Sequence, residues 1–382
     1  MNRGETVSRQ FDRMYQAITR AGALQPVLVP LYALVLSVII GGLLIATVGV
    51  NPFEAYWALL RGMFGSGDRL AASIARSVPY IGSALAMAFA FRAGFFNIGA
   101  EGQILAGGIL TAWVGTWAWV AVTPSPIAVV LMIMTGFIGG AAWGSVPGVL
   151  RATTGAHEVI TTIMLNSIIL FFVRWLINSR DPVILKDTEA TVPRTGPIGD
   201  NAAFPEFVGS EPSLHLGLVV LVVACVIAWI ILKYTTFGFE LQTLGTNIHA
   251  AAYAGMNVKR LTILAMAISG GWAGLSGASE VAGTNHLFQP GTFMNMGFDG
   301  IAIALLARAN PVAIIPAAVL WGSMLSGAPL MQAEADVSID VVRIIQALVV
   351  LFVAADAIVR YVFRIKNTDH HAIGPAATSW GA

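Results

Sequence analysis

The sequence predicts an all-α polytopic membrane protein, and three observations lead to this fold class. Hydrophobic residues make up 57% of the 382 positions and charged residues only 11%, whereas soluble domains carry about 25% charged residues. The mean hydropathy is strongly positive, at +0.77. About ten apolar segments follow one another along the chain, and most are long enough for the ~30 Å hydrocarbon core of a bilayer. With 21 basic and 20 acidic residues, no basic excess remains for nucleic acid.

The first apolar segment, 27–48, follows a basic N-terminal segment, 1–26, and contains no charged residue. At about 1.5 Å per residue it spans the hydrocarbon core, and it is too long for the apolar part of a signal peptide. We therefore expect an uncleaved first helix that opens a transmembrane domain over 27–363. The other expected segments are 77–93, 102–122, 127–149, 158–178, 216–233, 261–284, 298–309, 311–328 and 341–363.

The distribution of basic residues predicts that both termini lie in the cytosol. With the N-terminus inside, 13 of the 21 basic residues fall in cytosolic segments or at adjoining helix ends, as the positive-inside rule requires. The long segment 179–215 has six acidic against three basic residues and is expected outside. The loop 234–260 and the tail 364–382 are expected in the cytosol.

Two further patterns concern the interior of the bundle. The apolar stretch between Asp299 and Arg308 has only eight residues, so it cannot cross a bilayer and must be covered by protein or line a water-filled cavity. We expect a short or broken helix there. Small residues recur at every fourth position in two other segments, which indicates closely packed helices. They are Gly136, Gly140, Gly144 and Gly148, and Gly270, Gly274, Ala278 and Ala282.

Several kinds of chemistry are absent from the sequence. None of the four lysines follows a glycine, which excludes a Gly-Lys phosphate loop and ATP hydrolysis through one. The six histidines and the single cysteine, Cys225, show no metal-binding spacing. We therefore expect no metal and no cofactor bound by this chain.

Polar residues interrupt the apolar segments in four places. Asn97 and Glu101 lie in the sequence FNIGAEGQ, where a helix-capping turn is the simpler interpretation and Glu101 suits the first turn of the next helix. Glu158, Thr162 and Asn166 are spaced by four and form one polar stripe, which in a membrane faces a partner or an aqueous path. We expect Thr162 and Asn166 nearer such a path, and a structural role for Glu158.

The third place is the small-residue stretch 244–258, LGTNIHAAAYAGMNV, in the expected cytosolic loop. A short helix of this composition suits docking into a cleft of another protein, although packing on its own bundle would explain it too. The fourth place combines Glu280 with the segment 297–311, GFDGIAIALLARANP, which contains Asp299.

Taken in order, FNIGAEGQ, EVITTIMLN, LGTNIHAAAYAGM, AGLSGASEVAG and GFDGIAIALLARANP closely resemble segments of the permease subunits of bacterial ABC importers for nucleosides and simple sugars. These permeases are related to those for ribose and branched-chain amino acids. The likeness runs from about residue 30 to 365. Two positions depart from the pattern. The nucleoside branch usually has Asn at the position of His157, and it often has Gly at the position of Ala307.

The resemblance implies a permease subunit of the bacterial inner membrane that forms the path while a separate ABC ATPase uses ATP. It also implies an exterior binding lipoprotein or periplasmic protein and a second, related permease subunit. Candidate residues of the translocation path are Asn97, Thr162, Asn166, Glu280 and Asp299. Candidates for coupling to the ATPase are Gly245, Asn247, Ala250, Ala251 and Gly255. A simple sugar remains the alternative substrate. The alternative classes are an ion-driven secondary transporter, against which no inverted repeat is obvious, and an intramembrane enzyme, which lacks a nucleophile–base set.

Overall fold

The computed structural model describes residues 30–355. The predicted N-terminal segment 1–26, the tail 364–382 and the end of the last expected helix lie outside this range. Seven helices within it are long and apolar enough to cross a membrane, which confirms an all-α polytopic protein. They are Pro30–Thr47, α3 (Gly67–Arg92), α6 (Ser125–Thr154), α7 (Glu158–Asn178), α8 (Gly217–Tyr234), α11 with its π-helical extension (Val258–Asn285) and α13 (Pro311–Ala335).

Three of the ten expected segments form shorter helices. They are α4 (Ala100–Gly115), α12 (Met296–Leu306) and α14 (Ile339–Ala354). The expected segment 102–122 is interrupted because α4 ends at Gly115 and the short α5 (Ala118–Ala121) follows Trp117. The expected short helix near Asp299 is present as α12, with 11 residues, or about 16 Å of rise.

Local sequence explains where several of the long helices begin and end. The hydroxyl of Ser66 accepts from the backbone N–H of Arg69 and starts α3, and the side chain of Asn310 accepts from Val312 to start α13. Both are standard N-cap interactions. At the C-terminal end of α6, Gly155 adopts a φ of 71°, a left-handed conformation that glycine reaches without strain.

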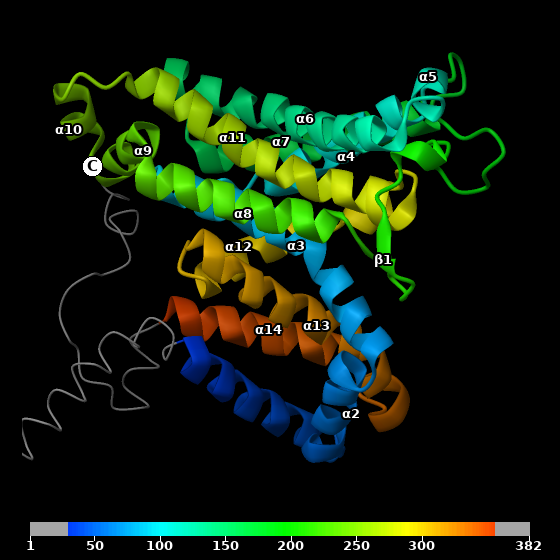
Figure 1. The fold of residues 1–382 in the computed structure, drawn as a ribbon. Helices are drawn as coiled ribbons and strands as arrows, with labels where there is room; N and C mark the ends of the chain where they lie inside the picture. The colour runs from blue at the N-terminus through cyan, green and yellow to red at the C-terminus, as the bar shows by residue number, and fades with distance from the viewer. Residues whose placement is uncertain (1–29, 356–382) are drawn as a thin grey trace, which may run out of the picture.

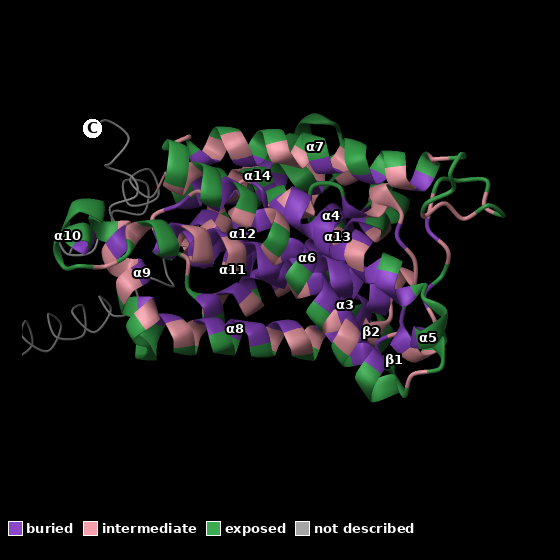
Figure 2. Ribbon diagram, turned by 90° about the horizontal axis from the view of Figure 1, so that it is seen from above, coloured by how far each residue is buried: buried purple, intermediate pink, exposed green. Residues whose placement is uncertain are grey.

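The helices form two groups that meet along α3 (Figure 1). One group contains α4, α6, α7, α8 and α11, and the other contains α12, α13, α14, the helix Pro30–Thr47 and α2 (Pro52–Phe64). Helix α3 contacts α11 of the first group and α12 and α13 of the second. Buried residues concentrate along these central helices, and exposed residues on the outer surfaces (Figure 2). The main apolar core therefore lies around α3 and α11 and extends onto α12 and α13.

Glycine residues bring α6 and α11 into backbone contact. A Cβ added to Gly140 would collide with the carbonyl oxygen of Gly270, and one added to Gly274 with that of Gly136. The two predicted stripes of small residues therefore face each other. Close packing of this kind gains dispersion energy that larger side chains would prevent.

The connecting segments carry the remaining elements. The expected exterior loop contains the 3₁₀ turn η1 (Asp200–Ala202) and the antiparallel strands β1 (Glu206–Val208) and β2 (Leu214–His215). The expected cytosolic loop contains α9 (Thr236–Thr246) and α10 (Ile248–Tyr253). Between α11 and α12 lie the π-helical η2 (Glu280–Asn285) and the 3₁₀ turn η3 (Pro290–Phe293).

The two short helices reveal an internal repeat. The sequence FFNIGAEG at 95–102 leads into α4, and FMNMGFDG at 293–300 leads into α12. The contacts follow the same relation, since α4 packs on α11 and α7 while α12 packs on α3 and α14. Likewise α6 packs on α11, and α13 packs on α3. The two short helices therefore have corresponding neighbours in the two parts of the chain.

Candidate functional site

Helices α4 and α12 begin inside the bundle, close to each other. The segment before α4 reaches Ser269, in the second half of α11, through the side chain of Asn97. The start of α12 lies against Ser83, whose hydroxyl donates to the carbonyl of Met296 (2.8 Å). Glycine at 300 is required because a Cβ there would collide with Ser83. Two helix N-termini thus meet at membrane depth, an arrangement that requires partners for their free N–H groups.

The N-terminus of α12 receives its partner from α4. Glu101 lies in the first turn of α4, and its carboxylate accepts from the backbone N–H of Asn295 (2.8 Å) and of Gly297 (2.7 Å). Asn295 itself adopts a left-handed φ of 69° and provides no side-chain cap. A negative charge at this position also suits the positive end of the helix dipole. Glu101 therefore joins the two half-helices.

The N-terminus of α4 is held by α7. The side chain of Asn166 accepts from the N–H of Gly102 (2.9 Å) and donates to the carbonyl of Ile98 (2.9 Å). Asn97 is fully buried and exchanges hydrogen bonds with Gln103 (2.8 and 3.0 Å), while it donates to Ser269 (2.7 Å). The polar atoms of Asn97 and Asn166 are thus committed to packing within the chain.

Glu158 and Thr162 lie at the start of α7. The carboxylate of Glu158 is 3.5 Å from the guanidinium of Arg151. Thr162 is fully buried, and its hydroxyl donates to the carbonyl of Glu158 (2.7 Å). The gap beside Thr162, which Gln103 and Trp143 also line, has no room for a water molecule. The stripe on α7 therefore faces other helices rather than an aqueous space in this structure.

Glu280 and Asp299 lie on the other side of the junction, near Glu101. Glu280 starts the π-helical turn η2 and accepts from the side chain of Asn285 (3.1 Å). Asp299 is partly exposed in the first turn of α12. Tyr80 and Arg76 of α3 lie in the same region, within range of the charges of these carboxyl groups. The start of α12 is therefore bordered by two acidic side chains, Glu101 and Asp299.

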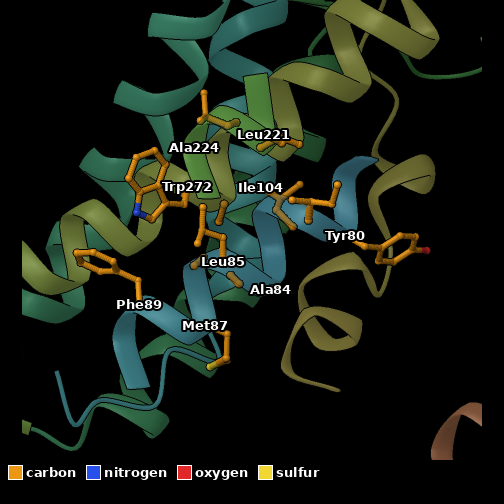
Figure 3. Close-up of a cluster of buried hydrophobic side chains, with 14 of the residues drawn as sticks. Tyr80, Ala84, Leu85, Met87, Phe89, Ile104, Leu221, Ala224 and Trp272 are labelled. Atoms are coloured by element: carbon orange, nitrogen blue, oxygen red, sulfur yellow. The ribbon is translucent and has the colours of Figure 1, made fainter. Parts of the chain in front are cut away.

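Tyr80, Arg76 and Asn295 were not identified from the sequence. Figure 3 shows Tyr80 at the edge of the buried apolar cluster, with its hydroxyl directed away from the other labelled side chains. The signal for Asn295 was present, because it corresponds to Asn97 in the repeated motif. Tyr80 and Arg76 follow no local pattern, since only the folded chain brings α3 against α12.

The cytosolic loop places its candidate residues in different surroundings. Asn247 caps α10 by accepting from the N–H groups of His249 (2.9 Å) and Ala250 (3.1 Å). Ala250 is exposed, whereas Ala251 is fully buried in the single chain. The most exposed large side chain on α10 is that of Tyr253, at 97%.

The two candidate glycines of this loop also have structural roles within the chain. Gly245 lies against the end of α3, because a Cβ there would be 2.7 Å from the nitrogen of Gly94. Gly255 has open space around it but a φ of 79°, so any larger residue would be strained whether or not a partner binds.

Comparison with known proteins identifies the family. Residues 69–354 match the permease family described as "Branched-chain amino acid transport system / permease component", and the chain belongs to this family. Together with the seven candidate spans, this membership makes the chain a multi-pass protein of the inner membrane. No solved structure gives a significant match.

Several characterised relatives are similar over nearly their whole length. The guanosine ABC transporter permease protein NupP of Bacillus subtilis is 40% identical, covering 89% of this chain and 96% of the relative. The nucleoside ABC transporter permease protein NupB of Lactococcus lactis is 36% identical (87% and 92%). The glucose ABC transporter permease protein TsgB13 of Haloferax volcanii is 31% identical (85% and 86%).

Bacillus subtilis and Lactococcus lactis each have a second permease that matches this chain more weakly. NupQ of Bacillus subtilis is 22% identical over 66% of this chain, and NupC of Lactococcus lactis is 24% identical over 64%. This chain is therefore more similar to NupP and NupB than to their companions.

Proposed function

We propose that this chain is a permease subunit of an ABC importer for nucleosides. The observation that carries the proposal is its similarity to two nucleoside permeases at 40% and 36% identity over almost the whole chain. The glucose permease is less similar, at 31%, which ranks a simple sugar second. The family membership argues against an ion-driven transporter.

The translocation path, in this proposal, follows the exposed side of the half-helix junction. Met294, Asn295 and Phe298 are exposed on the single chain, and Asp299 is partly exposed beside them. A non-helical backbone and polar groups at membrane depth are stable only against protein or water. Among the path candidates, Asp299 and Glu280 border this side, whereas Thr162, Asn97 and Asn166 support the helices behind it.

A second, different permease subunit would complete the path. NupP and NupQ are both named as guanosine permease proteins of one organism, and NupB and NupC as nucleoside permease proteins of another. Because this chain resembles NupP and NupB more closely, it would be the corresponding member of such a pair. The companion would pack on the exposed surface at the junction.

The ATPase partner would dock on α10 and supply the energy, since this chain has no Gly-Lys phosphate loop. The exposed residues of α10 include Ile248, Ala250, Ala252 and Tyr253. Small residues between two larger apolar ones allow the helix to enter a cleft closely. The binding protein would deliver the substrate on the opposite side, where the segment 179–215 lies.

The proposal is tested by reconstituting this chain in liposomes with a companion permease, an ATPase and a substrate-binding protein. We expect ATP-dependent uptake of guanosine that exceeds uptake of glucose. Uptake by this chain alone under a proton or sodium gradient would contradict the proposal and favour a secondary transporter.

Coupling is tested in the same system with Ala252→Trp. A tryptophan on a closely packed face costs about 1–3 kcal/mol of packing energy, so we expect at least a fivefold loss of ATPase copurification. Val122→Trp is the control, because Val122 is 81% exposed at the other end of the bundle. Normal copurification with Ala252→Trp would show that α10 is not the docking helix.

A further inference from the structure

The C-terminal end of α3 is joined to a segment that is distant in the sequence. Arg92 is the last residue of α3, and its Nε donates to the backbone carbonyl of Ala309 (3.1 Å). Ala309 follows the end of α12 and lies 217 positions further along the chain. A guanidinium group suits this place, because the carbonyl groups at the end of a helix carry partial negative charge and lack partners within the helix.

The backbone after α12 has a conformation that needs support from its surroundings. Arg308 and Ala309 have φ angles of 51° and 52°, in the left-handed region that residues other than glycine enter only at a cost in free energy. The N–H of Ala309 donates to the carbonyl of Ala304 (2.8 Å), while Arg92 binds the carbonyl of Ala309. The next residue, Asn310, caps α13. Arg92 therefore helps to fix the turn at which α12 ends and α13 begins.

The turn after α3 also lies against the docking loop, which consists of α9 and α10 (236–253) at one end of the bundle (Figure 1). A Cβ on Gly94 would be 2.7 Å from the Cα of Gly245, and one on Gly245 would be 2.6 Å from the carbonyl oxygen of Arg92. Gly245 belongs to the last turn of α9, and Asn247 then caps α10. Because two backbones touch here, no side chain can absorb a shift by changing its rotamer. A movement of α9 would therefore be passed directly to the end of α3.

We propose that Arg92 is a positioning residue that transmits movement of the docking loop to α12. This inference rests on the proposed function, in which the ATPase docks on α10 and α12 borders the translocation path. The contacts run from α10 through α9 and the end of α3 to Ala309. Helix α12 has only 11 residues and moves as one body, so a shift at its C-terminal end reaches Asn295 and Phe298 at its start.

An alternative route leads along α11, which follows α10 in the chain. The facing glycines of α6 and α11 are in backbone contact, so α11 could move only together with α6. Helix α12 is instead attached to α3 at both ends. Ser83 donates to the carbonyl of Met296 (2.8 Å) at its start, and Arg92 donates to that of Ala309 after its end. The route through α3 is therefore the more direct one to α12.

The test uses the reconstituted four-component importer and measures guanosine uptake and ATP hydrolysis in the same liposomes. Arg92→Met keeps the apolar stem of the side chain but removes its donors. We expect guanosine uptake per ATP hydrolysed to fall about five- to tenfold, comparable to the loss of one hydrogen bond, while the ATPase still copurifies. Arg92→Lys keeps a donor and the charge, so it should lose only about twofold. A residue that merely stabilised the fold would lower uptake and hydrolysis together.

Arg69→Met is the matched control for Arg92→Met. Arg69 lies near the other end of α3, where its guanidinium donates to the backbone carbonyl of Arg61 (3.0 Å), away from the docking loop. Its uptake per ATP should equal that of the wild type.

A second readout follows α12 itself, with Phe298→Cys in a Cys225→Ser background. The rate at which a water-soluble thiol reagent labels this cysteine should change when ATP is added. Arg92→Met should remove most of this change, and Arg69→Met should leave it.

The inference is overturned if Arg92→Met keeps the wild-type uptake per ATP, if Arg69→Met loses as much, or if a folded Arg92→Met no longer copurifies with the ATPase. In each case the proposed function would still stand. If Arg92→Met does not fold, Arg92→Lys is compared with Arg69→Lys by the same criteria. If the wild-type importer takes up no nucleoside, the proposed function fails and the inference with it.

Discussion

The two half-helices α4 and α12 start from similar sequences but are held in different ways. The first turn of α4 is capped by the side-chain amide of Asn166, which lies on the neighbouring helix α7. The first turn of α12 is capped by the carboxylate of Glu101, next to the exposed Asn295. The copy of the motif before α4 thus takes part in helix packing, whereas the copy before α12 borders a polar, partly open region.

This difference indicates which half of the repeat faces the substrate. A neutral amide satisfies a helix start without adding a charge to a buried site, where an uncompensated charge is costly. A carboxylate forms stronger hydrogen bonds to N–H groups, and it is tolerated near a region that water reaches. We therefore assign the α12 side to the path and the α4 side to the scaffold, and three experiments bear on this assignment.

The largest effect is expected from Glu101→Ala. It leaves the N–H groups of Asn295 and Gly297 without a partner, and hydrogen bonds to charged groups contribute about 1.5–3 kcal/mol each. We expect a loss of about 3–5 kcal/mol, measured as a lower thermal unfolding midpoint in detergent. Glu101→Gln, which keeps an acceptor oxygen, should lose less. An unchanged midpoint for the alanine variant would show that α12 does not depend on this cap.

The next effect concerns His215, which packs against the segment that connects α11 to α12. Its ring contacts Gly283 and is near Thr284 (3.3 Å), and a Cβ on Gly217 would also meet it. Burial, together with the nearby His286, lowers the pKa of His215 to about 4, although Glu206 acts in the opposite direction.

The sign of the pH effect follows from this pKa. Between about pH 6.5 and pH 4 the unfolded chain binds a proton at this histidine and the folded chain does not, so stability falls as the pH falls. We expect a loss of about 3 kcal/mol across this range, measured by thermal unfolding at each pH. The N–H of Gly217 donates to Nδ1 of His215 (3.1 Å). His215→Asn keeps an acceptor for this N–H and should remove most of the pH dependence. Equal acid sensitivity in the variant would assign the effect to other groups.

The smallest effect is expected from Asn166→Leu. It removes one partner from Gly102 and one from Ile98, at a cost of about 2 kcal/mol, while association with the ATPase should persist. In a Cys225→Ser background, a cysteine at position 166 should react slowly with a water-soluble thiol reagent and one at 298 quickly. Fast labelling at position 166 in any nucleotide state would show that Asn166 lines the translocation path, as the polar stripe predicted.

The sequence predicted the helices of this protein well because apolar length is a local property. The membrane class, the first helix, the short helix near Asp299 and the two stripes of small residues all follow from residues that are neighbours along the chain. The polar stripe of Glu158, Thr162 and Asn166 was also correctly placed on one helix. Its surroundings could not be predicted, because a period of four shows that residues share a face but not what covers it.

By itself the sequence determined that this chain lies in a membrane, that its helices are tightly packed and that two segments of it carry the same motif. Only the tertiary structure decided how these motifs are used. Glu101 and Asn295 are 194 positions apart, and Ser83 meets Met296 only because α3 packs on α12. The physical reason is that free N–H groups and buried charges must find partners wherever the fold brings them, and local sequence does not specify these distant partners.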